Sequence, residues 1–191
     1  MRNDIAFGDG FNVTKLEKYV NMADINHEEK IADGETVALI ELLFFAYRDF
    51  VSDPDAVLEQ LKFGRAHHRV VHFIGRNPGM TVAQLLDILR ITKQSLSRVL
   101  KELIDQGYVY QREGKSDRRQ RLLHLTKSGE ELRQRLMAPQ MSRIRRAIAE
   151  ASPDGSSRMH DILYHLISPE NRDDVKAWLH APSRDGEKNR G

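Results

Sequence analysis

The 191-residue sequence contains no cysteine. This absence excludes structural disulfides, zinc sites built on cysteine and redox sensing by a thiol. No apolar run approaches the roughly 18 residues of a membrane-spanning helix. The opening sequence, MRNDIAFGDG, lacks the apolar core of a secretory signal. Together these absences predict a cytoplasmic protein.

Motifs for catalysis are missing as well. The sequence holds no GxSxG nucleophile turn, no phosphate-binding P-loop and no glycine run of the dinucleotide-binding type. We therefore expect neither an enzyme nor a bound cofactor. The composition, 40% hydrophobic and 30% charged, is typical of a soluble helical protein with one compact domain or two small ones.

The net charge of +2 conceals a strong asymmetry along the chain. Residues 1–62 contain 6 Lys/Arg against 13 Asp/Glu, whereas residues 90–146 contain 15 against 6, so the net charges are −7 and +9. Nucleic-acid binding depends on Lys and Arg that neutralise phosphates. The basic half is the candidate contact surface for DNA, and a solvated helix surface is the simpler alternative.

The stretch from Thr81 to Thr126 begins with the pattern of two helices. Thr81 and Thr92 are suited to cap them, because a threonine hydroxyl accepts a hydrogen bond from the first helical turn. Gly107 is suited to end the second helix. Two helices joined by a short turn predict a helix-turn-helix, whose second helix enters the major groove. Apolar residues at helical spacing mark the inward faces: Val82, Leu85, Leu86 and Leu89, then Leu96, Val99, Leu100, Leu103 and Ile104.

A basic hairpin follows the second helix. Residues 108–110 and 122–125 favour strands, and the connecting sequence EGKSDRRQR is rich in turn formers and cations. A hairpin with a basic tip beside a helix-turn-helix is a winged helix, and its tip can reach phosphates or a narrow minor groove. The predicted fold class is therefore mainly α with a small β-wing (α+β).

This stretch resembles the MarR family of multiple-antibiotic-resistance regulators. The resemblance covers the winged region closely, and the flanking helical segments agree with the family in length and order. It implies a homodimer formed by the terminal helices and a small strand at residues 80–82 that pairs with the wing. Arg90 departs from the family, which commonly has a small residue in this turn. The matching runs are Ser95-Leu96-Ser97-Arg98, LIDQGYV at 103–109, and Asp117, Arg119, Leu123, Leu125, Thr126 and Gly129.

Candidate DNA contacts lie on the polar face of the second helix and on the wing. Gln94 and Arg98 are the candidates for reading bases, because Gln and Arg can make paired hydrogen bonds to adenine and guanine edges. In the family, the residue matching Asp117 orients the wing and the residue matching Arg119 enters the minor groove. A carboxylate two residues away can also fix a guanidinium. The predicted contacts are Thr92, Gln94, Ser95, Ser97, Arg98, Lys101, Arg112, Lys115, Asp117, Arg118, Arg119 and Arg121.

The segment before the winged region is predicted to be helical. Residues 35–51 are apolar almost all round, which is typical of a helix buried on several sides. A subunit interface would bury this helix, and the alternative is the central helix of a monomeric core. Asp53 and Pro54 are predicted to be the N-cap and first residue of a following helix, which bends or breaks near Gly64.

After the wing a long helix is expected, and Pro139 should kink or break it because proline removes a backbone hydrogen bond. Further helices are predicted between residues 156 and 179. The whole chain then divides into an N-terminal arm (1–34), a dimerisation helix with the start of a connecting helix (35–62), the winged helix-turn-helix domain (63–130), C-terminal dimerisation helices (131–180) and a flexible tail (181–191).

The family resemblance further implies a double-stranded, pseudo-palindromic DNA operator and a phenolic or other lipophilic acid as effector. The effector would bind between the dimer arms and the winged head. Plain core packing is an equal or stronger explanation for each candidate lining residue. These candidates are Phe44, Tyr47, Arg48, Phe63, His67, His68 and His72.

Three other functions stay open at this point. A sequence-tolerant architectural protein would use the same cations without reading bases, and a protein-interaction module would use the head on another protein. His68 and His72, four residues apart, could serve a metal-responsive regulator. Because an HExxH motif is missing and carboxylates near these histidines are sparse, no metal site is predicted.

Overall fold

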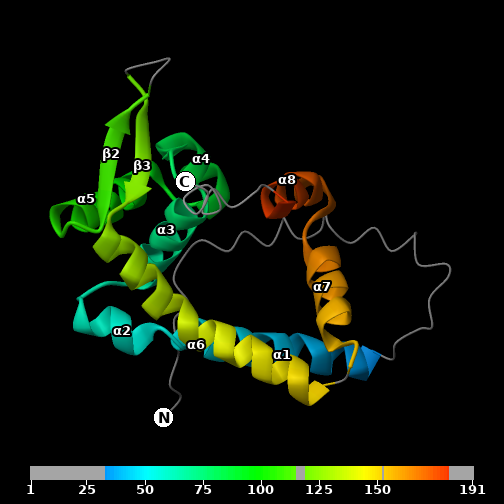
Figure 1. The fold of residues 1–191 in the computed structure, drawn as a ribbon. Coiled ribbons are helices and arrows are strands. Elements are labelled where there is room, and N and C mark those ends of the chain that lie inside the picture. The colour runs from blue at the N-terminus through cyan, green and yellow to red at the C-terminus, as the bar shows by residue number, and fades with distance from the viewer. Residues whose placement is uncertain (1–32, 115–118, 152, 181–191) are drawn as a thin grey trace, which may run out of the picture. The chain divides into compact units, whose positions relative to one another are not determined.

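The computed structural model describes residues 33–114, 119–151 and 153–180 (Figure 1). Most of the predicted arm and the predicted tail at 181–191 lie outside the described residues. The chain divides into two units, residues 1–43 and 44–191, and the first contributes the beginning of helix α1. In chain order the elements are α1 (Asp33–Ser52), α2 (Asp55–Gln60), α3 (Arg65–Arg76), β1 (Met80–Thr81), α4 (Val82–Leu89), α5 (Lys93–Asp105), β2 (Val109–Glu113), β3 (Arg121–Leu125), α6 (Lys127–Ala151), α7 (Gly155–Leu166) and α8 (Pro169–His180).

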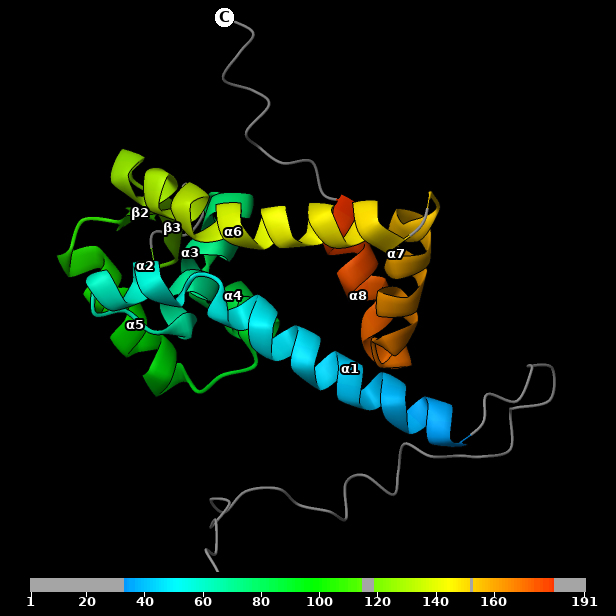
Figure 2. The same cartoon turned by 90° about the horizontal axis from the view of Figure 1, so that it is seen from below.

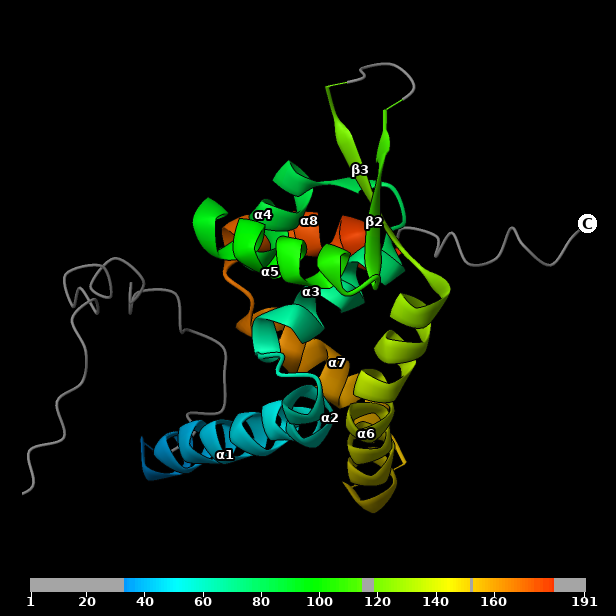
Figure 3. The same cartoon turned by 90° about the vertical axis from the view of Figure 1, so that its left-hand side faces the viewer.

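The second unit contains a winged helix-turn-helix. Its three strands form an antiparallel sheet in the order β1-β3-β2, in which Met80 pairs with Leu123 and Tyr110 pairs with His124. Figure 3 shows α3, α4 and α5 grouped together, with the β2–β3 hairpin projecting beyond them. The predicted hairpin and the small additional strand are both confirmed.

Both helices of the helix-turn-helix begin at the predicted threonine caps. The hydroxyl of Thr81 accepts a hydrogen bond from the N–H of Gln84 at 3.2 Å, and the Gln84 side chain accepts one from the Thr81 N–H at 2.9 Å. The hydroxyl of Thr92 accepts from the N–H of Ser95 at 3.2 Å. Gly107 follows α5 with φ +76°, a left-handed conformation that glycine adopts without steric strain.

The hydrophobic core lies within the winged head and extends to α2 and the first half of α6. Every helix and strand from α2 to α6 contributes to it, so the recognition helix α5 and the wing share one packed interior. Its members are Leu58, Phe63, Val70, Val71, Ile74, Met80, Leu85, Leu89, Leu96, Val99, Leu100, Leu103, Val109, Leu123, Leu132 and Leu136.

Helix α6 begins where the wing ends, and Thr126 makes the connection. Its hydroxyl donates to the carbonyl of Gly107 at 2.7 Å and accepts from the N–H of Gly129 at 3.0 Å. One side chain therefore links the end of α5, the end of β3 and the first turn of α6. Glycine is required at position 129, because an added Cβ would overlap the carbonyl oxygen of Tyr108.

Of the predicted kink or break at Pro139, the break is wrong. Helix α6 runs without a break from Lys127 to Ala151 (Figure 2). Proline removes one backbone hydrogen bond, but side-chain contacts hold the helix on both sides of it. Leu136 is fully buried, and the amide of buried Gln140 donates to the carbonyl of Phe50 at 2.9 Å.

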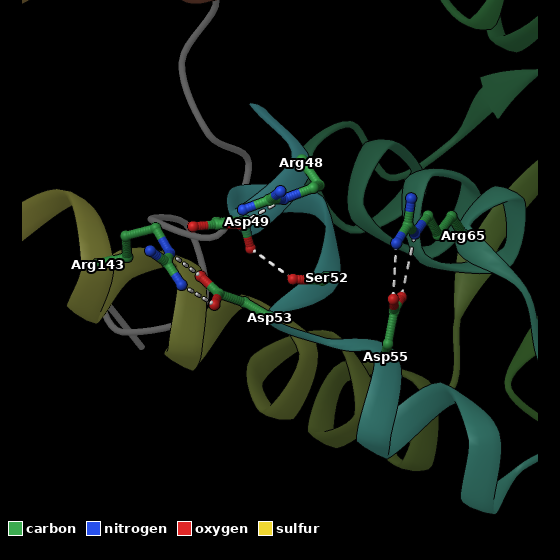
Figure 4. Close-up of polar contacts among 7 residues, drawn as sticks. All are labelled: Arg48, Asp49, Ser52, Asp53, Asp55, Arg65 and Arg143. Carbon is green, nitrogen blue, oxygen red and sulfur yellow. Dashed lines mark hydrogen bonds and ion pairs between the residues drawn. The ribbon is translucent and has the colours of Figure 1, made fainter. Parts of the chain in front are cut away.

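The predicted helix cap at Asp53 is also wrong, although the break near Gly64 is present. Helix α2 begins at Asp55, and the side chain of Asp53 turns instead to α6. Its carboxylate accepts two hydrogen bonds from the guanidinium of Arg143, each 2.6 Å long (Figure 4). The hydrogen bonding to Arg143 lowers the pKa of the Asp53 carboxyl, against the opposing effect of burial.

Helices α1, α7 and α8 contain no buried residue. Helix α8 contacts α3 through Trp178, whose ring lies 5.2 Å from that of Phe73 and 5.5 Å from the Arg76 guanidinium.

Arg90 adopts a left-handed φ of +52°, and its guanidinium donates to Asn171 of α8 at 3.4 Å. The residue that departs from the family pattern therefore contacts the C-terminal helix. No described helix is long and apolar enough to cross a membrane.

We expect Gly129→Ala to lower the free energy of unfolding by about 1–3 kcal/mol, the usual cost of overpacking a close-packed site. The added methyl meets backbone, which cannot move aside as a flexible side chain can. Urea denaturation measures the change. Gly64→Ala is the matched control, because a Cβ there meets nothing within 4 Å. Equal losses in the two variants would contradict the overlap at position 129.

Asp53→Asn should lower the free energy of unfolding at neutral pH by about 1 kcal/mol, the scale of a partly exposed charged hydrogen bond. Folding lowers the pKa of Asp53. The ionised carboxyl therefore stabilises the fold fully above its ordinary pKa of 3.8, and this stabilisation is lost as the pH falls further. Urea denaturation from pH 7 to pH 3 should show the difference shrinking in acid. Asp55→Asn is the control. The side chains of Asp55 and Arg65, which pair with each other (Figure 4), are both about half-exposed, so we expect a smaller loss in the free energy of unfolding.

Candidate nucleic-acid interface

Helix α5 presents a polar face to solvent because its apolar stripe is buried. Leu96, Val99, Leu100 and Leu103 lie in the core. The burial of that stripe turns the opposite side of the helix outward. The predicted contacts on α5 and at its cap are all exposed: Thr92, Gln94, Ser95, Ser97, Arg98 and Lys101.

These polar side chains differ in the hydrogen bonds and ion pairs that they already make within the protein. The hydroxyl of Thr92 donates to that of Ser95 at 2.9 Å, so both are held at the start of α5. The ammonium of Lys101 pairs with Asp105, and this hydrogen bond raises the pKa of Lys101. Arg98 has no ion pair within the described part of the chain. Unlike Lys101, it therefore has no acidic partner among those residues to give up before it contacts a base edge or a phosphate, and Lys93, also exposed, is in the same position.

In the described part of the wing, one arginine forms an ion pair and another lies on an aromatic ring. Arg121 pairs across the hairpin with Glu113 at 3.1 Å. The Arg112 guanidinium lies 5.2 Å from the ring of Tyr110, which stacks on His124 at 5.3 Å. Burial, followed by the charge of Arg112, lowers the pKa of His124. The outer face of the hairpin therefore presents a guanidinium on an aromatic platform.

The tip of the wing is only partly described. Arg119 is exposed. Lys115, Asp117 and Arg118 lie outside the described residues, so the predicted orientation of Arg119 by Asp117 stays a prediction.

The seven effector candidates fall into separate groups. Phe44 and Tyr47 are exposed at 67% and 64%, and Arg48 pairs with its neighbour Asp49 at 2.9 Å. Phe63 and His67 stack on each other at 4.4 Å inside the head. The structure of the single chain therefore does not gather all seven around one space.

The remaining two candidates, His68 and His72, lie on one face of α3. Burial lowers the pKa of His68 to about 4, and burial together with Arg133 and Arg76 lowers that of His72. The Nδ1 atom of His72 is buried without a hydrogen-bond partner among the described residues. Both rings are therefore neutral at neutral pH and can exchange hydrogen bonds rather than supply charge. Among those same residues, no group of three or more His, Asp or Glu is placed to hold a metal ion.

Two contacts were not foreseen from the sequence. Glu102 of α5 bonds to His67 of α3 at 2.7 Å, and Trp178 of α8 covers Phe73. The sequence holds one feature that could have pointed to each contact. Glu102 directly precedes the buried stripe residue Leu103, and Trp178 is the single tryptophan of the sequence.

Comparisons with known proteins agree with this architecture. The model of the MarR family matches residues 62–120. The chain is similar to the HTH-type transcriptional regulator PetP of Rhodobacter capsulatus, with 47% identity over 133 residues that cover 70% of this chain and 80% of that protein.

Two solved structures share the fold. FabT of Streptococcus pneumoniae in complex with DNA has a TM-score of 0.62 at 21% identity, covering 73% of this chain and 99% of that chain. A MarR family transcriptional regulator of Listeria monocytogenes in complex with 26-mer DNA has a TM-score of 0.60 at 21% identity, covering 73% and 91%. Both are winged-helix proteins whose structures contain DNA.

We expect Arg119→Ala to weaken binding to duplex DNA and to reduce the slope of log K against log salt by about 1, because each neutralised phosphate contributes about 0.9 to that slope. Titrations of a labelled duplex at several salt concentrations measure it. Arg158→Ala removes an exposed charge on α7, outside the basic stretch, and should leave the slope unchanged. An unchanged slope for Arg119→Ala would mean that the wing does not contact DNA.

Proposed function

This chain belongs to the MarR family of winged helix-turn-helix transcription regulators, and we propose that it binds a pseudo-palindromic operator as a homodimer controlled by a small-molecule effector. The family and the fold are those of a DNA-binding regulator rather than an enzyme. The observation that carries the proposal is the exposed polar face of α5 beside a basic hairpin, both anchored in one core. Each subunit would insert α5 into a major groove and the wing tip into the adjoining minor groove.

Duplex DNA as the partner is supported by the charge of the chain and by its structural neighbours. The excess of cations falls on α5, the wing and α6, where Arg143, Arg145 and Arg146 lie in the second half of the helix. The neighbours from Streptococcus pneumoniae and Listeria monocytogenes have the same fold and are in complex with DNA. Acting on chromosomal DNA, the regulator would work in the cytoplasm, and a dimer that covers a promoter would repress it.

Dimerisation is supported by large apolar side chains that the single chain leaves exposed. Contiguous exposed apolar surface on a folded chain marks an interaction site. A second copy is the occupant that a two-fold operator requires, because each half-site takes one head. We assign residues 35–62 and 131–180 to this role and residues 63–130 to the head. The exposed residues are Val37, Leu39, Ile40, Leu42, Leu43, Phe44, Phe45 and Tyr47 of α1, Met141 of α6, Ile162, Leu163 and Leu166 of α7, and Leu179 of α8.

Control by an effector is supported by the polar atoms buried around α3. The side-chain nitrogens Nδ1 of His72, Nδ2 of Asn77 and Nε1 of Trp178 are buried without a hydrogen-bond partner among the described residues. A lipophilic acid could accept hydrogen bonds from such groups, and Arg76 and Arg133 supply positive charge nearby. The ligand would act by binding one arrangement of the heads better than the other.

Selection of bound sites from a random pool of duplexes tests sequence-specific reading. We expect inverted half-sites whose centres lie about one helical turn, roughly 10 base pairs, or a multiple of it, apart. Recovery of duplexes without a common sequence would instead favour a sequence-tolerant architectural protein. A thermal-shift screen of small lipophilic acids then tests the effector.

Leu166→Glu should convert the dimer to a monomer, because it places a charge on the exposed apolar side of α7. Sedimentation equilibrium measures the mass, and we expect operator affinity to fall by about 10²-fold as the two half-sites are no longer bound together. Ser157→Glu adds the same charge to an exposed polar position of α7 and should leave the dimer intact. A dimer that survives Leu166→Glu at micromolar concentration would exclude this face from the interface.

A further inference from the structure

His67 lies in the first turn of α3 and is buried against an aromatic side chain. Its residue surface is 7% exposed, and its ring stacks on that of Phe63 at 4.4 Å with 8° between the planes. Both ring nitrogens have partners: Nδ1 accepts from the N–H of Gly64 at 3.1 Å, and Nε2 lies 2.7 Å from Oε2 of Glu102. Because Nδ1 is the acceptor, the proton of the neutral ring is on Nε2, which donates to the carboxylate.

Glu102 lies on α5, four residues after Arg98. An arginine and a carboxylate at this spacing on one helix are neighbours and can form an ion pair. The same helix contains such a pair, because Lys101 binds Asp105. Arg98 makes no corresponding pair within the described residues, since Glu102 is held by His67.

The Glu102 side chain is free to change partner. It is 42% exposed, so it can rotate towards Arg98 without repacking the core. His67, which is 9% exposed at its side chain, is the fixed member of the pair. Loss of the Nε2–H donor would therefore release a carboxylate one helical turn from Arg98, on the exposed polar face of α5.

We infer that His67 is a positioning residue of the DNA interface, which holds the Glu102 carboxylate on α3 and so keeps the Arg98 guanidinium available to DNA. The imidazole touches no nucleotide itself. This inference rests on the proposed contact of α5 with DNA, and it adds to that contact a residue outside the helix that controls which charges the helix presents.

Two substitutions separate this role from simple packing. His67→Phe keeps an aromatic ring on Phe63 and removes the donor to Glu102. His67→Gln removes the ring and keeps an amide that can donate to Glu102. With a duplex recovered from the random pool, His67→Phe should weaken binding about two- to fivefold at low salt, the scale on which a surface ion pair competes.

His67→Gln should change the affinity less than His67→Phe does. A packing role alone predicts the opposite order, because only His67→Phe retains the stacked ring. Urea denaturation of both variants confirms that they are folded at the assay temperature. His67→Leu, which also lacks a donor, replaces His67→Phe should that variant not fold.

Rescue completes the test. Adding Glu102→Gln to His67→Phe removes the charge that would pair with Arg98, and we expect the affinity to return to the wild-type value. In an Arg98→Ala background, His67→Phe should have no further effect. If Arg98→Ala weakens binding but Glu102→Gln does not rescue His67→Phe, this inference is overturned while the α5 contact stands. If Arg98→Ala leaves binding unchanged, the proposed α5 contact fails, and this inference fails with it.

Discussion

The hydroxyl of Thr126 holds together the three segments whose relative placement a winged head depends on. It bonds to the end of α5 at Gly107 and to the first turn of α6 at Gly129, and it follows directly on the last strand of the wing. The close approach of Gly129 to the Tyr108 carbonyl allows no side chain at that position. Helix α5, the wing and the long helix α6 therefore keep one geometry, and a movement of α6 would be transmitted to both α5 and the wing.

The elements governed by local rules could be predicted from the sequence. Thr81, Thr92 and Gly107 act through neighbours within three or four residues, so their roles can be read from the chain alone. Periodicity likewise predicted the buried stripe of α5 and hence its exposed polar face. The helix-turn-helix and hairpin follow from these rules, and the family resemblance added the small strand β1.

The errors arose where a distant residue changed a local preference. Asp53 has the side chain of a helix cap, but Arg143, ninety residues away in sequence, binds its carboxylate instead. Pro139 should interrupt a helix, but burial of Leu136 and Gln140 holds α6 together on both sides. The bond between His67 and Glu102 belongs to the same class, since a pocket lining was predicted for a ring whose two nitrogens are already used. Long-range partners of this kind leave no periodic trace in the sequence.

The same competition between local and distant partners shapes the charged face of α5. Lys101 and Asp105 satisfy the helical rule and neutralise each other, whereas Glu102 breaks that rule because α3 offers a better-ordered donor. Arg98 and Lys101 are both exposed cations of one helix, and of these two only Lys101 has an acidic partner among the described residues. The charge that α5 presents is thus decided by contacts inside the head as well as by its own sequence. A change that reaches α3 could alter DNA affinity through Glu102 even if the separation of the two heads stayed constant.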